Sequence, residues 1–154
     1  MNLKEAEQKA VEIVDLLKPN CKEILVVGSI RRKKPECKDI DIVLIPSDFL
    51  LLHAQILKLG ESMMDGPKIT RILHGGIQVD VYYATEETWG TLVLIRTGSR
   101  ESNQRLCSLA RRKGWQLKAS GEGLLDSSGK KIAGKEEDIF SALGLTYMRP
   151  EERA

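Results

Sequence analysis

The chain has 154 residues, 42% of them hydrophobic and 30% charged, and a formal net charge of +2 at pH 7. This composition is ordinary for a globular protein and excludes a disordered chain, and the length suffices for one domain or two small lobes. The charged N-terminus has no apolar signal segment, and no apolar run approaches the length of a membrane span, so we expect a cytoplasmic protein without a membrane partner.

The hydrophobic periodicity predicts helices and strands in both parts of the chain. Up to residue 83 these are a helix, two strands, a helix and two hairpin strands, over residues 3–18, 24–27, 40–45, 49–59, 68–73 and 77–83. Further on they are two helices, three short strands and a helix, over residues 86–95, 100–113, 115–118, 124–125, 131–132 and 136–143. We therefore expect an α+β fold, with a mixed or antiparallel sheet in residues 1–96 and a small α+β lobe in residues 97–154.

The cysteines indicate the redox environment of the protein, and the basic residues indicate the kind of partner that it binds. Three cysteines without metal-ligand spacing predict reduced thiols at Cys21, Cys37 and Cys107. Positive charge is concentrated in two segments, with a net charge of +4 over residues 31–38 and +6 over residues 96–131. This segregation suits a polyanionic partner, although a solvated basic face explains the same charges.

Two aspartates stand one residue apart in a strand that is otherwise apolar. Asp39 and Asp41 project to the same face of that strand, with Cα atoms roughly 6.5–7 Å apart, because side chains alternate along a strand. A third carboxylate, Asp80, lies within the second hairpin strand. Buried carboxylates need a counter-charge, and Mg²⁺ prefers oxygen ligands of this kind. The alternative is that the acids form the solvent-exposed side of a half-buried sheet.

Two Gly-Ser pairs are candidate phosphate-binding turns. Gly28-Ser29 follows a strand and precedes Arg31-Arg32, so backbone N–H groups can approach an anion there while serine and arginine add donors. Gly98-Ser99 lies just before a predicted helix. A single Gly-Ser pair is a weak signal, since turns are rich in both residues. Three acids together with such turns favour two-metal phosphoryl or nucleotidyl transfer.

These motifs together resemble a known family. The strings GSIRR, DID, VDV and TGSRESN and the closing segment IAGKEEDIFSALGLTYMRPEER are similar to the nucleotidyltransferase superfamily, and within it to the family X DNA polymerases related to polymerase beta. The resemblance runs from about residue 20 to the end of the chain. It implies a polymerase beta-like palm over residues 1–96 and a C-terminal nucleotide- and template-binding lobe over residues 97–154. This minimal architecture lacks the lyase domain and the helix-hairpin-helix segments, so lyase activity is not expected.

The resemblance also implies roles for individual residues. Asp39, Asp41 and Asp80 would be the catalytic acids that ligate two Mg²⁺ ions, for which Mn²⁺ can substitute, and Asp80 would help to activate the primer 3′-hydroxyl. The 3′-oxygen would attack the α-phosphorus of a dNTP, with pyrophosphate leaving on the second metal. The residues expected to bind the incoming nucleotide are Gly28, Ser29, Arg32, Gly98, Ser99 and Asn103.

The chain departs from the family pattern at four positions. Ile95 and Arg96 replace an aromatic pair, Cys107 stands where an arginine usually faces the template, and Gln78 replaces an arginine before the third acid. The departures bear on sugar selection and fidelity rather than on metal chemistry. Contacts with DNA are expected from Lys33, Lys34, Gln78, Arg96, Arg100, Arg105, Arg111 and Arg112.

The resemblance implies a monomeric, template-directed DNA polymerase that uses dNTPs on primer-template or gapped DNA, in repair or short gap filling. An alternative keeps the chemistry but transfers the nucleotide to an RNA end, a protein or a small molecule. A third possibility is a catalytically silent nucleic-acid-binding domain.

Several other residues are expected to be structural. His53 and His74 have no partners at ligand spacing and are predicted to lie on a helix surface or in a loop. Trp89, Trp115 and the leucines of residues 49–59 are predicted core residues, and Cys107 a small buried helix residue.

Overall fold

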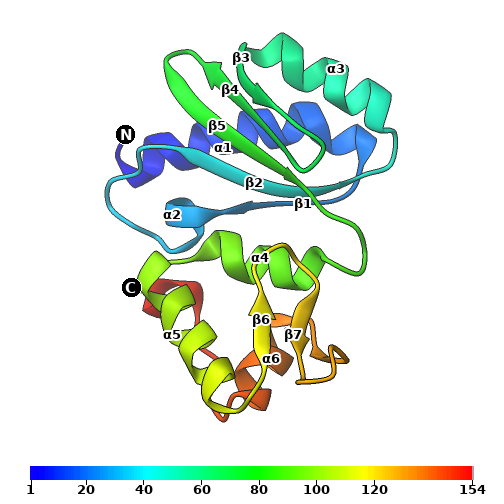
Figure 1. The fold of residues 1–154 in the computed structure, drawn as a ribbon. Helices are drawn as coiled ribbons and strands as arrows, with labels where there is room; N and C mark the ends of the chain where they lie inside the picture. Colours follow the sequence, from blue (N-terminus) through cyan, green and yellow to red (C-terminus); the bar gives the residue numbers. More distant parts are fainter. Residues whose placement is uncertain (154) are drawn as a thin grey trace.

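A mixed five-stranded sheet forms the centre of the N-terminal part of the chain (Figure 1). The computed structural model describes residues 1–153. The strands lie in the spatial order β1-β2-β5-β4-β3, where β2 and β5 run parallel and the other neighbours run antiparallel. Their bounds are Cys21–Val27 for β1, Ile40–Pro46 for β2, Glu61–Asp65 for β3, Ile69–His74 for β4 and Ile77–Tyr83 for β5.

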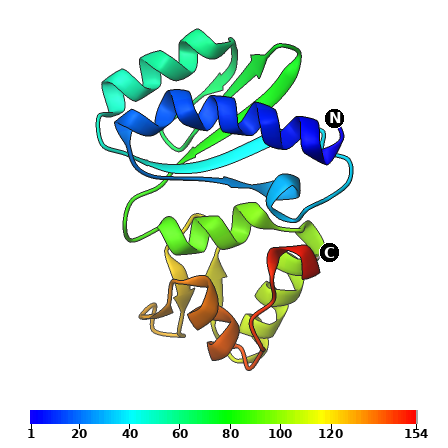
Figure 2. The same cartoon turned by 180° about the vertical axis from the view of Figure 1, so that it is seen from behind.

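Two helices, α1 (Leu3–Leu17) and α3 (Phe49–Leu59), cover one face of this sheet (Figure 2). Helix α1 buries residues at helical spacing, among them Ala6 and Ile13, against alternate residues of the strands. In β2 the residues on this face, such as Ile40 and Ile42, are fully buried. Asp41, the predicted acid within β2, therefore projects to the opposite face of the sheet.

The C-terminal part packs below the sheet around its own smaller core (Figure 1). Its elements are α5 (Arg100–Arg112), a three-stranded sheet of β6 (Gln116–Lys118), β7 (Gly123–Leu125) and β8 (Lys131–Ala133), α6 (Glu136–Ala142) and the short 3-10 helix η2 (Pro150–Glu152). Helix η2 lies beside α2 (Gly28–Arg31) and the start of α5 (Figures 1 and 2).

Helix α4 (Trp89–Thr97) belongs to both cores. Leu92 and Val93 pack against the face of the sheet opposite α1, whereas Leu94 and Ile95 pack into the C-terminal core. All four side chains are buried, so this helix is apolar on nearly every side. The two parts of the chain consequently share a packed helix rather than a flexible linker.

A buried ionic network also joins the two parts. Arg31 donates to both carboxylate oxygens of Glu136, with N–O distances of 2.8 and 2.9 Å, and to the Thr97 hydroxyl at 2.7 Å. Arg153, whose side chain is fully buried, donates to the same carboxylate at 2.6 Å. Burial by itself would raise the pKa of Glu136, but the hydrogen bonds and charges of Arg31 and Arg153 outweigh it and lower that pKa.

The structure confirms the predicted α+β fold with a mixed sheet, and the hairpin turn lies at Gly75-Gly76, where both glycines have positive φ. Strand β3, the short helix α2 and a 3-10 turn at Lys18–Asn20 were not predicted. The helix expected over residues 86–95 begins later, at Trp89.

One prediction about the core is wrong. The leucines of residues 49–59 do not all lie in the core, because only one side of α3 packs against the sheet: Leu52 and Ile56 are buried, whereas Leu50 is 80% exposed and Leu51 is 56% exposed. The tryptophans Trp89 and Trp115 are half-buried and pack at the edges of the two smaller cores.

The histidines and cysteines make local contacts. His53 lies 2.8 Å from Asp65, and the Nδ1 atom of His74 lies 2.6 Å from the carbonyl oxygen of Leu59. The three cysteines are free thiols, and Cys107 is half-buried. Within residues 1–153, no helix combines the length and apolarity that crossing a bilayer requires.

Candidate active site

The first Gly-Ser pair lies directly against one of the predicted acids. Val27 pairs with Asp41 in the β1–β2 ladder, and α2 begins at the next residue, Gly28. Gly28 has φ +63°, and a Cβ atom there would lie 2.3 Å from the Oδ2 atom of Asp41. Only glycine leaves room for the carboxylate, so this residue shapes the site by lacking a side chain.

Two of the three predicted acids, Asp41 and Asp80, share the face of the sheet opposite α1, whereas Asp39 lies just before β2, which begins at Ile40. Asp41 and Asp80 are directly paired neighbours on the parallel strands β2 and β5. Burial raises the pKa of Asp41 to about 6, and the charges of Asp80 and Asp39 add to that rise. Arg96 and Arg32 lower the pKa of Asp41 and partly oppose the effect. The acids thus form an electrostatically coupled cluster.

A divalent cation fits this cluster in ligand type and in charge. Carboxylate oxygens are the ligands that Mg²⁺ prefers, and a cation would offset the burial of the Asp41 charge and the repulsion from Asp80 and Asp39, which together raise the pKa of Asp41. As arranged, however, no three Asp, Glu, His or Cys side chains of residues 1–153 converge on one point. The carboxylate of Asp80 is instead hydrogen-bonded to Arg71 and Gln78.

Arg32 connects the first Gly-Ser turn to the second. Arg32 follows α2 and donates from Nη1 to the carbonyl oxygen of Thr97 at 2.5 Å, and the same Nη1 atom lies 3.2 Å from the position of a Cβ on Gly98. Ser99 caps α5 by accepting a hydrogen bond from the backbone N–H of Ser102. The two turns, seventy residues apart in sequence, are therefore neighbours.

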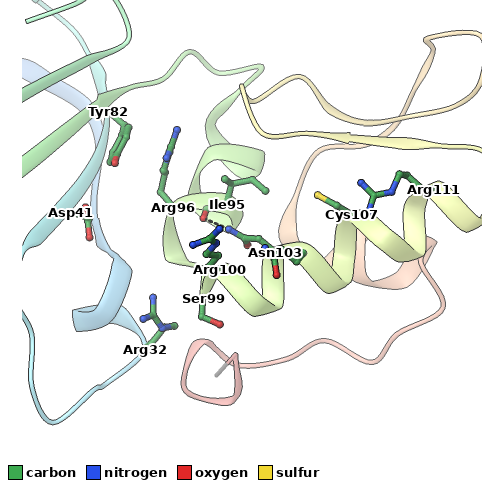
Figure 3. Close-up of a pocket in the computed structure, with 12 residues that line it drawn as sticks. Arg32, Asp41, Tyr82, Ile95, Arg96, Ser99, Arg100, Asn103, Cys107 and Arg111 are labelled. Atoms are coloured by element: carbon green, nitrogen blue, oxygen red, sulfur yellow. Dashed lines mark hydrogen bonds between the residues drawn. The ribbon is translucent and has the colours of Figure 1, made fainter.

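A cavity of about 540 Å³ opens between Asp41 and the second Gly-Ser turn (Figure 3). Four of the predicted site residues lie outside its lining, namely Gly28, Ser29, Asp39 and Asp80. Asp41 and Arg32 line it from the sheet side, and Ser99 and Asn103 from α5. Its lining contains one carboxylate and four arginines, namely Arg32, Arg96, Arg100 and Arg111. The cavity therefore suits an anionic ligand.

Two polar atoms in the lining have no partner within residues 1–153. The amide nitrogen of Asn103 donates to the carbonyl oxygen of Ile95 at 2.8 Å, which leaves the Oδ1 atom of Asn103 buried and unpaired. The Nε atom of Arg32 is also buried and unpaired. Unpaired buried polar atoms are costly, and both side chains line the cavity, where a bound polar molecule can supply partners.

Arg96 occupies one of the positions where the family pattern has an aromatic residue. Its guanidinium lies 4.3 Å from the centre of the Tyr82 ring (Figure 3). Such stacking holds the cation beside Asp41 without using its N–H donors. The structure thus places a positive charge at this position, next to the acids.

The predicted DNA-contacting residues divide into two groups. Arg96, Arg100 and Arg111 line the cavity, and Gln78 lies beside Asp80. The others lie outside the cavity lining: Lys33, Lys34, Arg105 and Arg112. The Nζ atom of Lys33 lies 3.4 Å from the Oε2 atom of Glu7 on α1, so this salt bridge partly neutralises the charge of Lys33.

The sequence did not lead us to predict Arg71 as a partner of the third acid, Asp80. The Nε atom of Arg71 donates to the Oδ1 atom of Asp80 at 2.7 Å. The signal was present in the hairpin register, because counting back from the turn at Gly75-Gly76 pairs residue 74 with residue 77 and therefore Arg71 with Asp80.

Comparison with known proteins identifies a family model, a protein and a crystal structure to which this chain is similar. Residues 92–154 match the family model described as DNA polymerase beta thumb. The DNA polymerase/3'-5' exonuclease PolX of Bacillus subtilis (strain 168) is 24% identical over a region covering 82% of this chain and 23% of that protein. A crystal structure of Leishmania infantum polymerase beta, described as a ternary P/T complex, matches with a TM-score of 0.83 and 20% identity, over 100% of this chain and 76% of that one.

The chain is similar to the DNA polymerases of family X. This confirms the resemblance inferred from the motifs, and the structural match shows a shared polymerase beta-like fold. The chain spans 23% of the length of its family X relative from Bacillus subtilis. The match to the thumb model begins at residue 92, inside α4. The division into a palm over residues 1–96 and a C-terminal lobe over residues 97–154 stays a prediction. The roles of the individual site residues also stay predictions.

Proposed function

We propose that the chain is a template-directed DNA polymerase that adds dNTPs to a primer 3′-hydroxyl, in repair or short gap filling. The observation that carries the proposal is the place of Arg32, which bridges the two Gly-Ser turns and shares one cavity with Asp41. A guanidinium there suits a triphosphate held next to metal-binding carboxylates. The names of the two relatives, a DNA polymerase and a polymerase beta, support the same reading.

Residues in the cavity lining, together with Ser29 beside it, would divide the work of binding. Ser29 and Arg32 would hold the phosphates, because they follow the one glycine that lets α2 approach Asp41. Asn103 would hydrogen-bond to the base through its unpaired Oδ1 atom. Gly98 and Ser99 would lie against the sugar.

The reaction would form a bond between the 3′-oxygen and the α-phosphorus, break the bond to pyrophosphate and transfer the hydroxyl proton to a base, the part that Asp80 would take. Two Mg²⁺ ions, held by Asp39, Asp41 and Asp80, would when bound lower the pKa of the 3′-hydroxyl and offset the charge on pyrophosphate. The protein contributes orientation, since paired strands fix Asp41 beside Asp80 while Arg32 holds the phosphates.

A primer-extension experiment tests the proposal. A labelled primer is supplied on gapped, recessed and single-stranded DNA, with each dNTP and each NTP in turn, and with Mg²⁺ or Mn²⁺. We expect incorporation that follows the template base and requires the divalent ion. Transfer to RNA ends or proteins without template dependence supports a nucleotidyltransferase with another acceptor. Binding of DNA without transfer under any condition contradicts enzymatic activity.

The substitution Arg32→Ala tests the proposed triphosphate contact. We expect KM for the dNTP to rise about 10- to 100-fold, because one or two charge-assisted hydrogen bonds worth about 1.5–3 kcal/mol are lost. The Kd for primer-template DNA should change less than about threefold. Arg149→Ala removes an exposed arginine near the C-terminus and is the matched control. An equal effect of Arg32→Ala on both affinities contradicts a role specific to the triphosphate.

A further inference from the structure

The carboxylate of Asp80 is fully engaged by the protein itself. Asp80 is 5% exposed, and both of its oxygens accept hydrogen bonds from Arg71, at 2.7 Å from Nε and 3.3 Å from Nη2. Gln78 donates to the same two oxygens at 3.3 Å. Arg71 stands directly opposite Asp80 in the β4–β5 ladder, so the pair is fixed by the sheet.

Asp41 is in the opposite situation. Within residues 1–153 its carboxylate has no hydrogen bond and no ion pair, although it is the cross-strand neighbour of Asp80. Arg32 and Arg96 act on it through their charge alone. One acid of the proposed metal site is thus free to bind an ion, while another is neutralised by a guanidinium.

We propose that Arg71 is an internal counter-ion that occupies Asp80 in the metal-free protein and must leave before Asp80 can bind a divalent cation. The inference rests on the proposed function, because it takes Asp80 to be a metal ligand. A guanidinium and a metal ion cannot share the same two carboxylate oxygens, so the two compete.

Arg71 has a place to move to. Its side chain is 30% exposed and borders a second cavity, of about 540 Å³, on the far side of the stacked pair Tyr82 and Arg96. Lys68 also lines this cavity, whose one acidic lining residue is Glu122. An arginine turned into this cavity keeps contact with solvent, has Glu122 as an acidic neighbour on an otherwise largely apolar lining, and leaves Asp80 open. Arg71 is therefore a positioning residue that sets how readily the third acid receives its ion.

The test measures Mn²⁺ binding to the full chain without DNA or nucleotide, by electron paramagnetic resonance and by the shift in Tm on adding Mn²⁺. We expect Arg71→Gln to tighten Mn²⁺ binding at least about tenfold, because both charge-assisted hydrogen bonds from Arg71 to Asp80 are lost. Arg71→Lys keeps a charge without the planar fork and should tighten binding less. The control Lys9→Gln removes one positive charge from an exposed position on α1 and should leave the Kd within about twofold.

The outcomes separate this inference from the proposed function. If Asp80→Asn leaves Mn²⁺ binding unchanged, Asp80 is not a metal ligand and the proposed metal site is wrong. If Asp80→Asn weakens binding but Arg71→Gln leaves it unchanged or weaker, the metal site stands and the counter-ion role of Arg71 is overturned. Should Arg71→Gln not fold, Arg71→Lys decides, since unchanged or weaker binding in that variant also overturns the role.

Discussion

Replacing Asp41 with asparagine should reduce nucleotide incorporation at least about 10³-fold, which corresponds to about 4 kcal/mol of lost transition-state stabilisation. The expectation follows from its position: Asp41 lies beside Asp80 in the sheet, borders the cavity and has no competing ion-pair partner within residues 1–153. The measurement is the rate of single-nucleotide incorporation at saturating dNTP and Mg²⁺.

The same substitution should not destabilise the metal-free protein. The pKa of Asp41 in the folded chain is about 6, above the ordinary value of 3.8, so its ionised form at pH 7 is less favourable in the folded than in the unfolded state. Removing that charge should raise Tm. Asp15→Asn, at an exposed position on α1, is the control and should change neither quantity. Incorporation by Asp41→Asn at more than a tenth of the unsubstituted rate contradicts the proposed mechanism.

Replacing Glu136 with glutamine should destabilise the whole chain by about 3 kcal/mol. The substitution leaves the fully buried Arg153, together with Arg31, without a carboxylate partner, and breaking a buried ion pair typically costs about 3–5 kcal/mol. Thermal unfolding should show a fall in Tm of roughly 6–12 °C for a chain of this size. Chemical unfolding in urea gives an independent measure of the free energy of unfolding.

The adjacent glutamate is the matched control for this prediction. Glu137 lies in the same first turn of α6 but is exposed and has no salt bridge to another residue of the described chain. Glu137→Gln should cost less than about 1 kcal/mol, the limit of a favourable helix-dipole contact at an exposed position. Equal effects at the two positions contradict the importance of the buried network.

The network also explains why the two parts of the chain hold one cavity between them. Arg31 links the turn after β1 to α6 and to Thr97, while its neighbour Arg32 reaches the carbonyl oxygen of the same Thr97. The backbone nitrogen of Ser99 donates to the carbonyl oxygen of Arg153. The cavity wall therefore depends on residues near the end of the chain.

The strands that carry the acids could be predicted from local sequence. Ile40–Pro46 and Ile77–Tyr83 are rich in β-branched residues, and Asp41 and Asp80 face away from the residues that pack under α1 because strand side chains alternate. Strand β3 could not be predicted in this way, because all five residues of Glu61–Asp65 are exposed and carry no apolar alternation. Its pairing with β4 is what makes it a strand.

The exposed leucines of α3 show a second limit of local reasoning. The run Phe49–Leu59 is apolar on more than one face, so hydrophobicity alone assigned it to the core. The structure buries only the stripe that contains Leu52 and Ile56, since the sheet covers one side of the helix.

The sequence by itself determined the chemistry that is available: two acids at strand spacing, a third acid in a hairpin, and glycines where backbone must approach closely. The tertiary structure decided which charges meet. Arg31 and Arg32 are adjacent and chemically identical, yet one is tied to Glu136 and the other lines the cavity. Their roles differ because successive side chains leave the backbone in different directions, and only the packing of α6 and α4 against α2 supplies a partner for each.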